Sequence, residues 1–583
     1  MNIAILMIIT IPVFWLAFRY FGRYLEKVFD ADNNRSTPAV ELKDDVDYVP
    51  TKTGVVFSHH FASIAGAGPI IGPTVAMIFG YIPVWLWVVV GGVFIGAVHD
   101  FTALFVSIRE KGKSIAEVAN HNLGKSGFLL FIAFTVALLI LVTAAFLQLT
   151  ATALGSLVPL KDMGLEAGKT ILKVVEKDGV AYGQIGGIAS MSVIIMTLFA
   201  PLLGWLIYKK NINIYLGALL AVLVGALSIT LGIYYPVTIQ SEIWMIILSV
   251  YTLLAAGIPV WALLQPRDFT NSFILYLGMA AMVVGIFGGG LVGLKLNMPA
   301  FNIAEGVKFG GAIWPFLFIT VACGAISGFH ALVAGGTVSK QVSKEKDART
   351  IGYGGMLLES LLAAGVIITL ASSLNFDTYH NIVFPTIAGA KSNPILAFAL
   401  GVGGLLNKSI GLPIPVGTVF GILMVEGFVV TTLDTAVRLQ RYLLEELWTT
   451  LFKNPPKILK SYLLNAGIAV ALMLYFGWTN LFTLIWPIFG TANQLLAALT
   501  FIAITAWLAN RKKPTWFTII PAIFMMATTL WSLYILLVTK YLPLKNMLLT
   551  ITDLILMLLS IGVVILGVSK VMAFRKSKTT ISA

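Results

Sequence analysis

The feature that most constrains this chain is a series of about fifteen apolar runs, most of them roughly 18 residues or longer, separated by short polar segments. Because a helix of roughly 20 apolar residues crosses a bilayer, these runs predict membrane-spanning helices. Only 11% of the residues are charged and 58% are hydrophobic, whereas soluble domains carry about 25% charged residues. This composition excludes a soluble enzyme. The sequence predicts an all-α polytopic membrane protein with about 15–18 transmembrane helices.

The charge distribution predicts the orientation of the chain. Lys and Arg number 39 against 26 Asp and Glu, a net charge of +13. In a soluble protein this excess would suggest a nucleic acid partner, but here most of the basic residues fall in alternate loops. Basic loops stay in the cytoplasm, so we expect the N-terminus outside, the C-terminus cytoplasmic and no nucleic acid partner. The polar segment 19–53 is then expected to cover the cytoplasmic face.

The chain divides into four predicted regions. Residues 1–53 form the first transmembrane helix and a cytoplasmic loop, and residues 54–372 form the core. Residues 373–412 contain the apolar run 382–406, and residues 413–583 form the C-terminal transmembrane helices. One full crossing by 382–406 would place many basic residues outside, so we expect a re-entrant hairpin or two short helices there. One ordinary span with an undetected neighbour is the alternative.

Helix-breaking residues interrupt the run FSHHFASIAGAGPIIGPTVAMIFG, which begins at Phe57. Proline removes a backbone donor and clashes with the preceding turn. Backbone groups freed at this depth are tolerated only inside protein or along a wet cavity, and transporters use such half-helix ends to bind substrates and ions. A proline kink used only for packing is the alternative. We predict substrate contacts at Gly66, Ala67, Gly68 and Pro69.

A second interruption is expected in the helix 242–264, where the sequence reads AAGIPVW before the helix ends in QPRDF. Under the predicted topology the two broken helices lie five spans apart and run in opposite directions, which indicates an inverted five-plus-five repeat. The residues expected to face the first break across one substrate site are Gly257, Ile258, Pro259 and Trp261.

Several ionisable residues lie inside the predicted spans, where each is costly and suggests a function. Five of them fall within roughly 8 to 12 Å of the same membrane face at 1.5 Å per residue: His59, His60, His99, Asp100 and His330. Together they favour a proton-handling role, although each histidine alone is equally consistent with a hydrogen-bonded structural role.

Other polar residues in the spans are expected to be structural. Glu359 and Glu426 could neutralise buried basic groups or bond to backbone, and Asp434 and Arg438 have the spacing of an ion pair along one helix. The amides Asn493 and Gln494 follow the breakers in WPIFGTANQLLAAL. They could line a cavity, with Gln494 as a wall of the substrate site, or bond across helices.

Known catalytic signatures are absent from the sequence. It contains no HExxH, no glycine-rich phosphate loop followed by lysine, and no CxxC. The single cysteine, Cys323, cannot form a disulfide within the chain and is expected to be a small packed residue. We therefore expect no enzyme activity, no metal and no cofactor.

Several motifs resemble the carbon starvation protein A family over nearly the whole chain. They are FSHHFASIAGAGPIIGP, GAVHDF, LLQPRDF, ISGFHALVAGGTVSK, DARTIGYGGMLLE, TTLDTAVRLQRY and WPIFGTANQLLA. The resemblance implies a bacterial or archaeal inner-membrane transporter, associated with peptide uptake during carbon starvation and in some members with proton-coupled pyruvate uptake. The family is grouped with the amino acid, polyamine and organocation superfamily, which implies a leucine-transporter-like fold.

These observations favour a secondary active importer of small peptides or pyruvate, coupled to protons. In sodium-coupled transporters of that fold, a cation site lies between the first broken helix and the eighth core helix, here 312–336. This helix offers Ser327 without an adjacent hydroxyl, and His330 follows one turn later. We expect His330, with His59 or His60, Asp100 and Ser327, to handle the proton. The alternatives are a sodium-coupled solute symporter, a channel, and a membrane-embedded redox protein that uses histidines.

Overall fold

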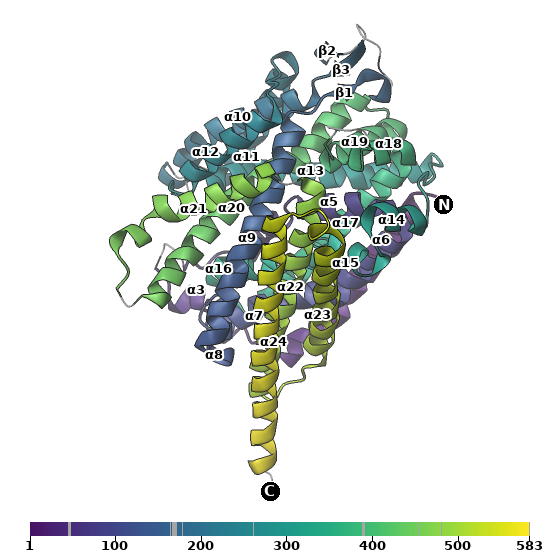
Figure 1. The fold of residues 1–583 in the computed structure, drawn as a ribbon. Coiled ribbons are helices and arrows are strands. Elements are labelled where there is room, and N and C mark those ends of the chain that lie inside the picture. Colours follow the sequence, from purple (N-terminus) through teal and green to yellow (C-terminus); the bar gives the residue numbers. More distant parts are fainter. Residues whose placement is uncertain are drawn as a thin grey trace. The chain divides into compact units, whose positions relative to one another are not determined.

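The computed structural model describes the whole chain except residues 45–47, 164, 166–171, 178, 211, 260–261, 387–390, 453, 480 and 582–583. The fold is helical (Figure 1), with one small sheet. Within the described residues, 12 helices are long and apolar enough to cross a membrane, or up to 14 if each of two bent helix pairs is one span. This is fewer than the 15–18 expected, partly because two apolar helices, Ser241–Ala255 and Pro394–Ile410, are shorter than a span.

The chain forms two compact units. Unit 1 comprises Met1–Met7, Leu139–Asn302 and Gly365–Ile485. Its elements are β1 (Val158–Pro159), β2 (Val174–Lys177), β3 (Val180–Gly183), α10 (Ile185–Gly204), α11 (Ile214–Tyr234), α12 (Ser241–Ala255), α13 (Leu264–Leu291), α18 (Phe376–Val383), α19 (Pro394–Ile410), α20 (Ile414–Leu451) and α21 (Tyr462–Thr479).

Unit 2 comprises Ile8–Leu138, Ile303–Ala364 and Trp486–Ala583. Its elements are α2 (Gly22–Val28), α3 (Pro38–Glu41), α4 (Thr53–Ile64), α5 (Gly68–Ala76), α6 (Tyr81–Gly91), α7 (Ala97–Arg109), α8 (Ile115–Leu123), α14 (Ile303–Gly310), α15 (Ile313–Thr320), α16 (Phe329–Gly336), α23 (Trp516–Leu536) and α24 (Met547–Ile581). Residues of both units belong to α1 (Ala4–Leu16), α9 (Lys125–Leu154), α17 (Gly354–Ser373) and α22 (Phe482–Asn510).

The sheet was not expected from the sequence. Its strand order is β1-β3-β2, both pairs are antiparallel, and Val158 and Val174 both pair with Gly183. The strands lie between α9 and α10, in a segment that carries both signs of charge. The sheet belongs to unit 1 and is not a separate domain.

The first predicted break is confirmed. The axis bends by 42° between α4 and the helix Gly68–Phe79. Pro69 lies in the first turn of α5, where its missing N–H would have no partner in any case. Gly72 allows a close approach, because a Cβ there would lie 2.8 Å from the Thr320 carbonyl oxygen. Gly72 therefore lets α5 pack closely against the end of α15.

The structure corrects two helix predictions. The expected continuous helix 312–336 is divided into α15 and α16 by the non-helical residues 321–328. The motif QPRDF does not end a broken helix over 242–264, because α12 stops at Ala255 and α13 begins at Leu264. QPRDF forms the first turns of α13 instead, directly after Leu264. The segment 373–412 contains α18 and α19, and its membrane topology stays a prediction.

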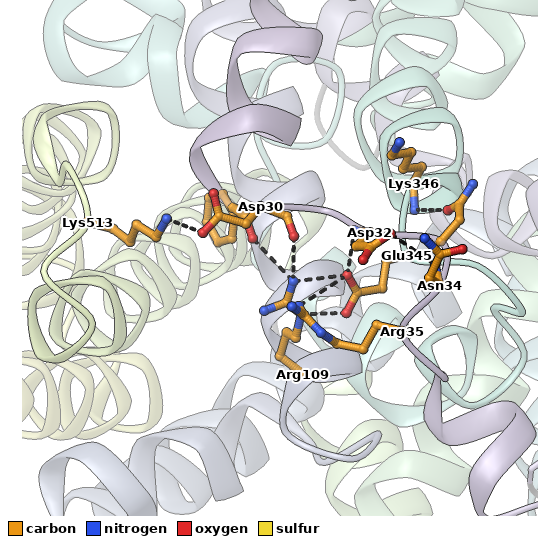
Figure 2. Close-up of polar contacts among 10 residues, drawn as sticks. Asp30, Asp32, Asn34, Arg35, Arg109, Glu345, Lys346 and Lys513 are labelled. Carbon is orange, nitrogen blue, oxygen red and sulfur yellow. Dashed lines mark hydrogen bonds and ion pairs between the residues drawn. The ribbon is translucent and has the colours of Figure 1, made fainter.

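A polar network holds the N-terminal segment 29–35 against unit 2. Figure 2 shows Arg109, the last residue of α7, and Arg35 converging on Glu345. The Arg109 Nε donates to Glu345 at 2.5 Å, and its Nη2 donates to Glu345 at 2.9 Å and to the Asp30 carbonyl at 3.0 Å. The Glu345 side chain is 1% exposed, and the Asp32 amide donates to it at 2.9 Å. Lys513 pairs with Asp30. The segment is thus ordered over one end of this unit.

Candidate functional site

The break between α4 and α5 and the break at 321–328 lie against each other. A Cβ at Gly68, the first residue of α5, would overlap the Cys323 side chain. A Cβ at Gly324 would lie 2.7 Å from the Ala363 side chain and 3.7 Å from Pro69 Cα. The predicted substrate residues Gly66, Ala67, Gly68 and Pro69 therefore lie beside the non-helical segment 321–328. The family resemblance implied that the helix 312–336 lies beside the first break, but the interruption of that helix at 321–328 was not expected.

Side chains of α22 and α6 satisfy the backbone groups freed by the break at 321–328. The Asn493 Oδ1 accepts from the Phe329 amide at 3.0 Å, and the Asn493 carbonyl accepts from the Gly328 amide at 3.1 Å. Gln494 Nε2 donates to the Phe318 carbonyl at 2.6 Å. Trp87 Nε1 donates to the same carbonyl at 3.2 Å. The sequence left two roles open for Asn493 and Gln494, lining a cavity or bonding across helices. These contacts are hydrogen bonds across helices.

Ser327 also belongs to this hydrogen-bonded support. Its hydroxyl accepts from Asn493 Nδ2 at 3.0 Å and lies 3.3 Å from Asn493 Oδ1. The Gln494 Oε1, in contrast, is buried without a hydrogen-bond partner among the described residues. Gln494 therefore keeps one free acceptor beside the break.

Buried ionisable groups gather next to the break. Nδ1 of His330 lies 2.7 Å from Oδ2 of Asp100, and Nδ1 of His99 lies 2.8 Å from Oδ1 of the same carboxylate. The other ring nitrogen of His330, Nε2, lies 3.3 Å from Oε2 of Glu359. All four side chains are at most 1% exposed. Elements α7, α16 and α17 thus place one imidazole between two carboxylates.

The structure places the two predicted histidines of α4 differently. His60 is fully buried, and a Cβ at Gly355 in α17 would lie 3.2 Å from its Cδ2. Neither His60 ring nitrogen has a hydrogen-bond partner in the described part of the chain. His59 is partly exposed, and its carbonyl accepts from the Ser63 hydroxyl at 2.8 Å. Asp100 and His330 are in contact, as expected. Glu359 also belongs to this cluster of buried ionisable groups, although the sequence did not assign it there.

The predicted residues near 257–261 belong to unit 1, and Trp261 lies outside the described residues. The carbonyl groups that end α12 accept hydrogen bonds from two arginines of α20. Arg438 Nη2 donates to Ala255 at 2.6 Å and to Ile258 at 2.7 Å, and Arg441 Nη1 donates to Ala256 at 2.7 Å. Because the two predicted breaks lie in different units, a shared substrate site stays a prediction.

The expected ion pair between Asp434 and Arg438 is wrong. Asp434 pairs with Arg267 of α13 at 2.6 Å and accepts from the Tyr251 hydroxyl at 2.9 Å. The side chains of Arg267 and Asp434 are 2% and 0% exposed. Helical spacing identified neighbours on one helix, whereas a buried charge requires a partner that shields it from the apolar surroundings. In the sequence, the position of Arg267 at the boundary of a predicted span was the one indication of this partner.

Glu426 of α20 is fully buried, and its carboxylate oxygens have no hydrogen-bond partner within the described residues. It therefore does not neutralise a basic group there. No group of three or more His, Cys, Asp or Glu side chains that could hold a metal ion occurs among the described residues.

Comparison with protein families explains the shared motifs. The family model described as carbon starvation protein CstA matches residues 2–390 and 372–532. The chain belongs to the CstA family. CstA membership places it with transporters and not with enzymes.

Curated CstA relatives cover most of the chain. The peptide transporter CstA of Campylobacter jejuni is 31% identical, covering 90% of this chain and 79% of the relative. The peptide transporter CstA of Bacillus subtilis is also 31% identical, covering 92% and 90%. The pyruvate/proton symporter BtsT of Escherichia coli is 29% identical, covering 91% and 81%. Among solved structures, a manganese transporter mutant of Eremococcus coleocola aligns at 11% identity with a TM-score of 0.44, covering 90% and 95%.

Proposed function

We propose that this chain is a secondary active importer of short peptides or pyruvate, driven by proton entry across a prokaryotic inner membrane. The observation that carries the proposal is the position of His330. Its ring lies between Asp100 and Glu359, and it is the second residue of α16, directly after the non-helical segment 321–328. His330, the candidate proton-binding residue, therefore directly follows the non-helical segment that lies beside the candidate substrate residues Gly68 and Pro69.

A carboxylate is the chemical group that the break favours. In the first turn of α5 the Ile70 and Ile71 amides donate to the Ala67 carbonyl and Pro69 has no N–H, so the attraction for a carboxylate rests on the partial positive charge of the helix N-terminus. The first turn of α5, at Gly68 and Pro69, is buried in the protein beside the break at 321–328. Pyruvate and peptides each carry a carboxylate, and the curated relatives are named for these two substrates.

Protonation of His330 would change the contacts on both of its sides. A neutral imidazole has one donor and one acceptor nitrogen, whereas the protonated ring has two donors. The protonated ring can therefore donate to Asp100 and Glu359 together. Loss of the proton leaves one carboxylate facing a nitrogen lone pair, which is unfavourable in a buried site. One proton thus controls how α7, α16 and α17 hold together.

Sodium coupling is the competing proposal. Sodium is a hard cation, and such ions prefer oxygen ligands. The Ser327 hydroxyl is engaged with Asn493, whereas imidazole titrates near neutral pH. These observations favour the proton.

We further propose a leucine-transporter-like inverted repeat, with the N-terminus outside. For the second repeat we propose a break at 321–328 instead of the one expected at 257–261. The letters IAGAG beginning at Ile64 and VACGA beginning at Val321 are similar, and both stretches lie where a helix stops. We propose that these two segments are the equivalent breaks of the two repeats, so that the segment 312–336 corresponds to the sixth core helix and not to the eighth as expected from the sequence.

Uptake by proteoliposomes tests the proposed function. Pyruvate and a dipeptide are supplied outside, with and without an inside-alkaline pH gradient and with and without sodium. We expect one substrate to accumulate with the gradient and without sodium. His330→Gln should abolish accumulation but retain substrate exchange, whereas His380→Gln, on α18 outside the cluster, should behave like the parent. Strict sodium dependence, or normal accumulation by His330→Gln, would overturn proton coupling through this site.

A further inference from the structure

One buried imidazole has no part in the mechanism described so far. His60 of α4 is fully buried, and neither of its ring nitrogens has a hydrogen-bond partner in the described part of the chain. Leaving a buried polar group without a partner is costly, so such groups are rare in protein interiors and call for a specific explanation. The proposed proton site uses His330, Asp100 and Glu359 and makes no use of His60.

The His60 ring lies against the backbone of α17. A Cβ at Gly355 would lie 3.2 Å from His60 Cδ2 and 3.7 Å from His60 Nε2. The same Cβ would lie 3.6 Å from Cδ1 of Ile64, the last residue of α4. The final turn of α4 therefore packs on α17 at Gly355, where the absence of a side chain makes room for the imidazole. A larger residue at this position would displace the ring.

Glu359 lies one turn further along the same face of α17. Residues four apart on a helix are neighbours, and helical side chains lean toward the N-terminus. The Glu359 side chain therefore leans toward Gly355 and the His60 ring. Neither carboxylate oxygen of Glu359 has a hydrogen-bond partner within the described residues, and His330 Nε2 approaches one of them to 3.3 Å. A carboxyl group and an imidazole that both lack a hydrogen bond thus lie within one helical turn of each other.

The other charged groups around α4 are engaged elsewhere. The titratable side chains of α4 itself and of the segments packed against it are the partly exposed His59 and, further, His330, Lys340, Asp347, Arg349 and Glu359. Lys340 lies over an aromatic ring, Asp347 accepts from a hydroxyl at 2.7 Å, and Arg349 pairs with a carboxylate at 3.1 Å. His330 directs both of its ring nitrogens at carboxylates. Glu359 is therefore the group best placed to exchange a proton with the buried imidazole of α4.

We propose that His60 accepts the transported proton from Glu359 and makes substrate binding depend on it, a role that rests on the proposed function. In this step the O–H bond of the Glu359 carboxylic acid breaks, and its electron pair stays on the carboxylate. A lone pair of one His60 ring nitrogen forms the new N–H bond. The products are an imidazolium and a carboxylate, and the transfer needs no further reactant.

The position of His60 connects this charge to the candidate substrate residues. His60 lies one turn before Ile64, where α4 ends, and the non-helical residues 65–67 follow directly. A charge in a buried site acts over longer distances than one in water. The imidazolium therefore adds to the partial positive charge at the start of α5, and the protonated protein should bind a substrate carboxylate more tightly than the unprotonated one.

Equilibrium exchange in proteoliposomes tests this role without a pH gradient. Labelled pyruvate and a labelled dipeptide are each exchanged at about pH 6 and about pH 8, on either side of the range in which histidine titrates. For the parent we expect an apparent KM that is lower at the acidic pH by roughly 5-fold or more, as for typical coupled sites. His60→Gln should exchange substrate with the same KM at both values. Gly355→Ala, which displaces the ring without changing it, should reduce the difference.

Two controls match these variants. Gly365→Ala changes another glycine of α17, where a Cβ would have no heavy atom nearer than 3.6 Å, and His380→Gln removes a histidine of α18. Both should keep the KM difference of the parent. If His60→Gln is not folded, Gly355→Ala decides, and a KM difference equal to that of the parent would then overturn the role of His60.

The inference and the proposed function can fail separately. A parent KM that does not change with pH, or a KM difference that persists in His60→Gln, would overturn the role of His60. Accumulation driven by the pH gradient and its loss in His330→Gln would still support the proposed function in either case. An equal loss of the KM difference in the two controls would also overturn a specific role for His60.

Discussion

Nε2 of His330 lies 3.3 Å from Oε2 of Glu359, and both side chains are at most 1% exposed. When a glutamate and a histidine are in direct contact, they bind and release protons as a pair and not as two independent groups. Since Asp100 occupies the other ring nitrogen of His330, Glu359 is the group best placed to exchange the proton with it.

The first prediction concerns this glutamate. Glu359→Gln preserves the shape of the side chain but cannot bind or release a proton. We expect gradient-driven accumulation to fall by roughly 5-fold to 150-fold, the range of a coupling free energy of about 1–3 kcal/mol, while substrate exchange persists. Uptake in proteoliposomes measures both quantities. Glu426→Gln, a second fully buried glutamate, is the control, and an equal loss in that variant would contradict a specific role for Glu359.

The second prediction concerns the contact between the two breaks. Gly68→Ala should strongly reduce uptake, because the new Cβ would overlap the Cys323 side chain. Cys323→Gly removes both the Sγ and the Cβ that the new group would meet. We therefore expect the double variant to recover much of the uptake rate, and Gly68→Leu to remain inactive although it is expressed and folded. If Cys323→Gly gives no recovery, the contact does not explain the defect.

The third prediction concerns the support of the break. Asn493→Ala leaves the Phe329 amide and the Ser327 hydroxyl without their partner. Each buried group left unsatisfied costs about 1–3 kcal/mol, so we expect lower thermal stability in detergent and a higher apparent KM for uptake. Thr518→Ala, which alters a different buried side-chain bond in unit 2, should leave the KM unchanged. An unaltered apparent KM in Asn493→Ala would show that Asn493 does not contribute to the substrate site.

The fourth prediction concerns the buried ion pair of unit 1. Arg267→Met should destabilise the protein by roughly 3–5 kcal/mol, because it leaves the buried Asp434 charge without its partner. Asp434→Leu should cost less, because Asp268 lies 3.9 Å from the Arg267 guanidinium and compensates part of its charge. The double variant should be more stable than either single variant. Thermal unfolding of the purified parent, the two single variants and the double variant gives the four measurements of a double-mutant cycle. Lys391→Met, which breaks a pair whose side chains are 43% and 49% exposed, should have little effect. Additive losses in the double variant would argue against a direct pair.

The fifth prediction concerns membrane topology. Single cysteines at Asn381 and Asn407 in a Cys323→Ala background should both react with an impermeant reagent from outside, as the distribution of basic residues requires. These positions lie in α18 and near the end of α19. Labelling of one of them only from the cytoplasm would show that the segment 382–406 crosses the membrane.

Residue chemistry predicted the parts of the site that depend on local signals. The glycines and prolines around Pro69 identified the first break because their effect on a helix is intrinsic. Equal depth in the membrane was also enough to group Asp100 with His330, since few ionisable side chains occur in the spans.

The remaining features depend on contacts between distant segments. Gly324 and Gly328 are too isolated to predict a break, which is maintained by Asn493 and Gln494 some 165 residues further along the chain. Likewise, spacing on one helix suggested Arg438 as the partner of Asp434, while the fold supplied Arg267. Such pairings require knowledge of which helices are neighbours.

The hydrogen bonds that hold the two non-helical segments differ in charge. At the end of α12 the carbonyls accept from the guanidinium groups of Arg438 and Arg441, whereas at the end of α15 the Phe318 carbonyl accepts from the neutral groups of Gln494 and Trp87. Bonds from ionised donors are roughly twice as strong as neutral ones. By this measure the carbonyls at the end of α12 are held more strongly than the Phe318 carbonyl at the end of α15. A substrate that binds beside the segment 321–328 would therefore compete with weaker hydrogen bonds than one that binds at the end of α12.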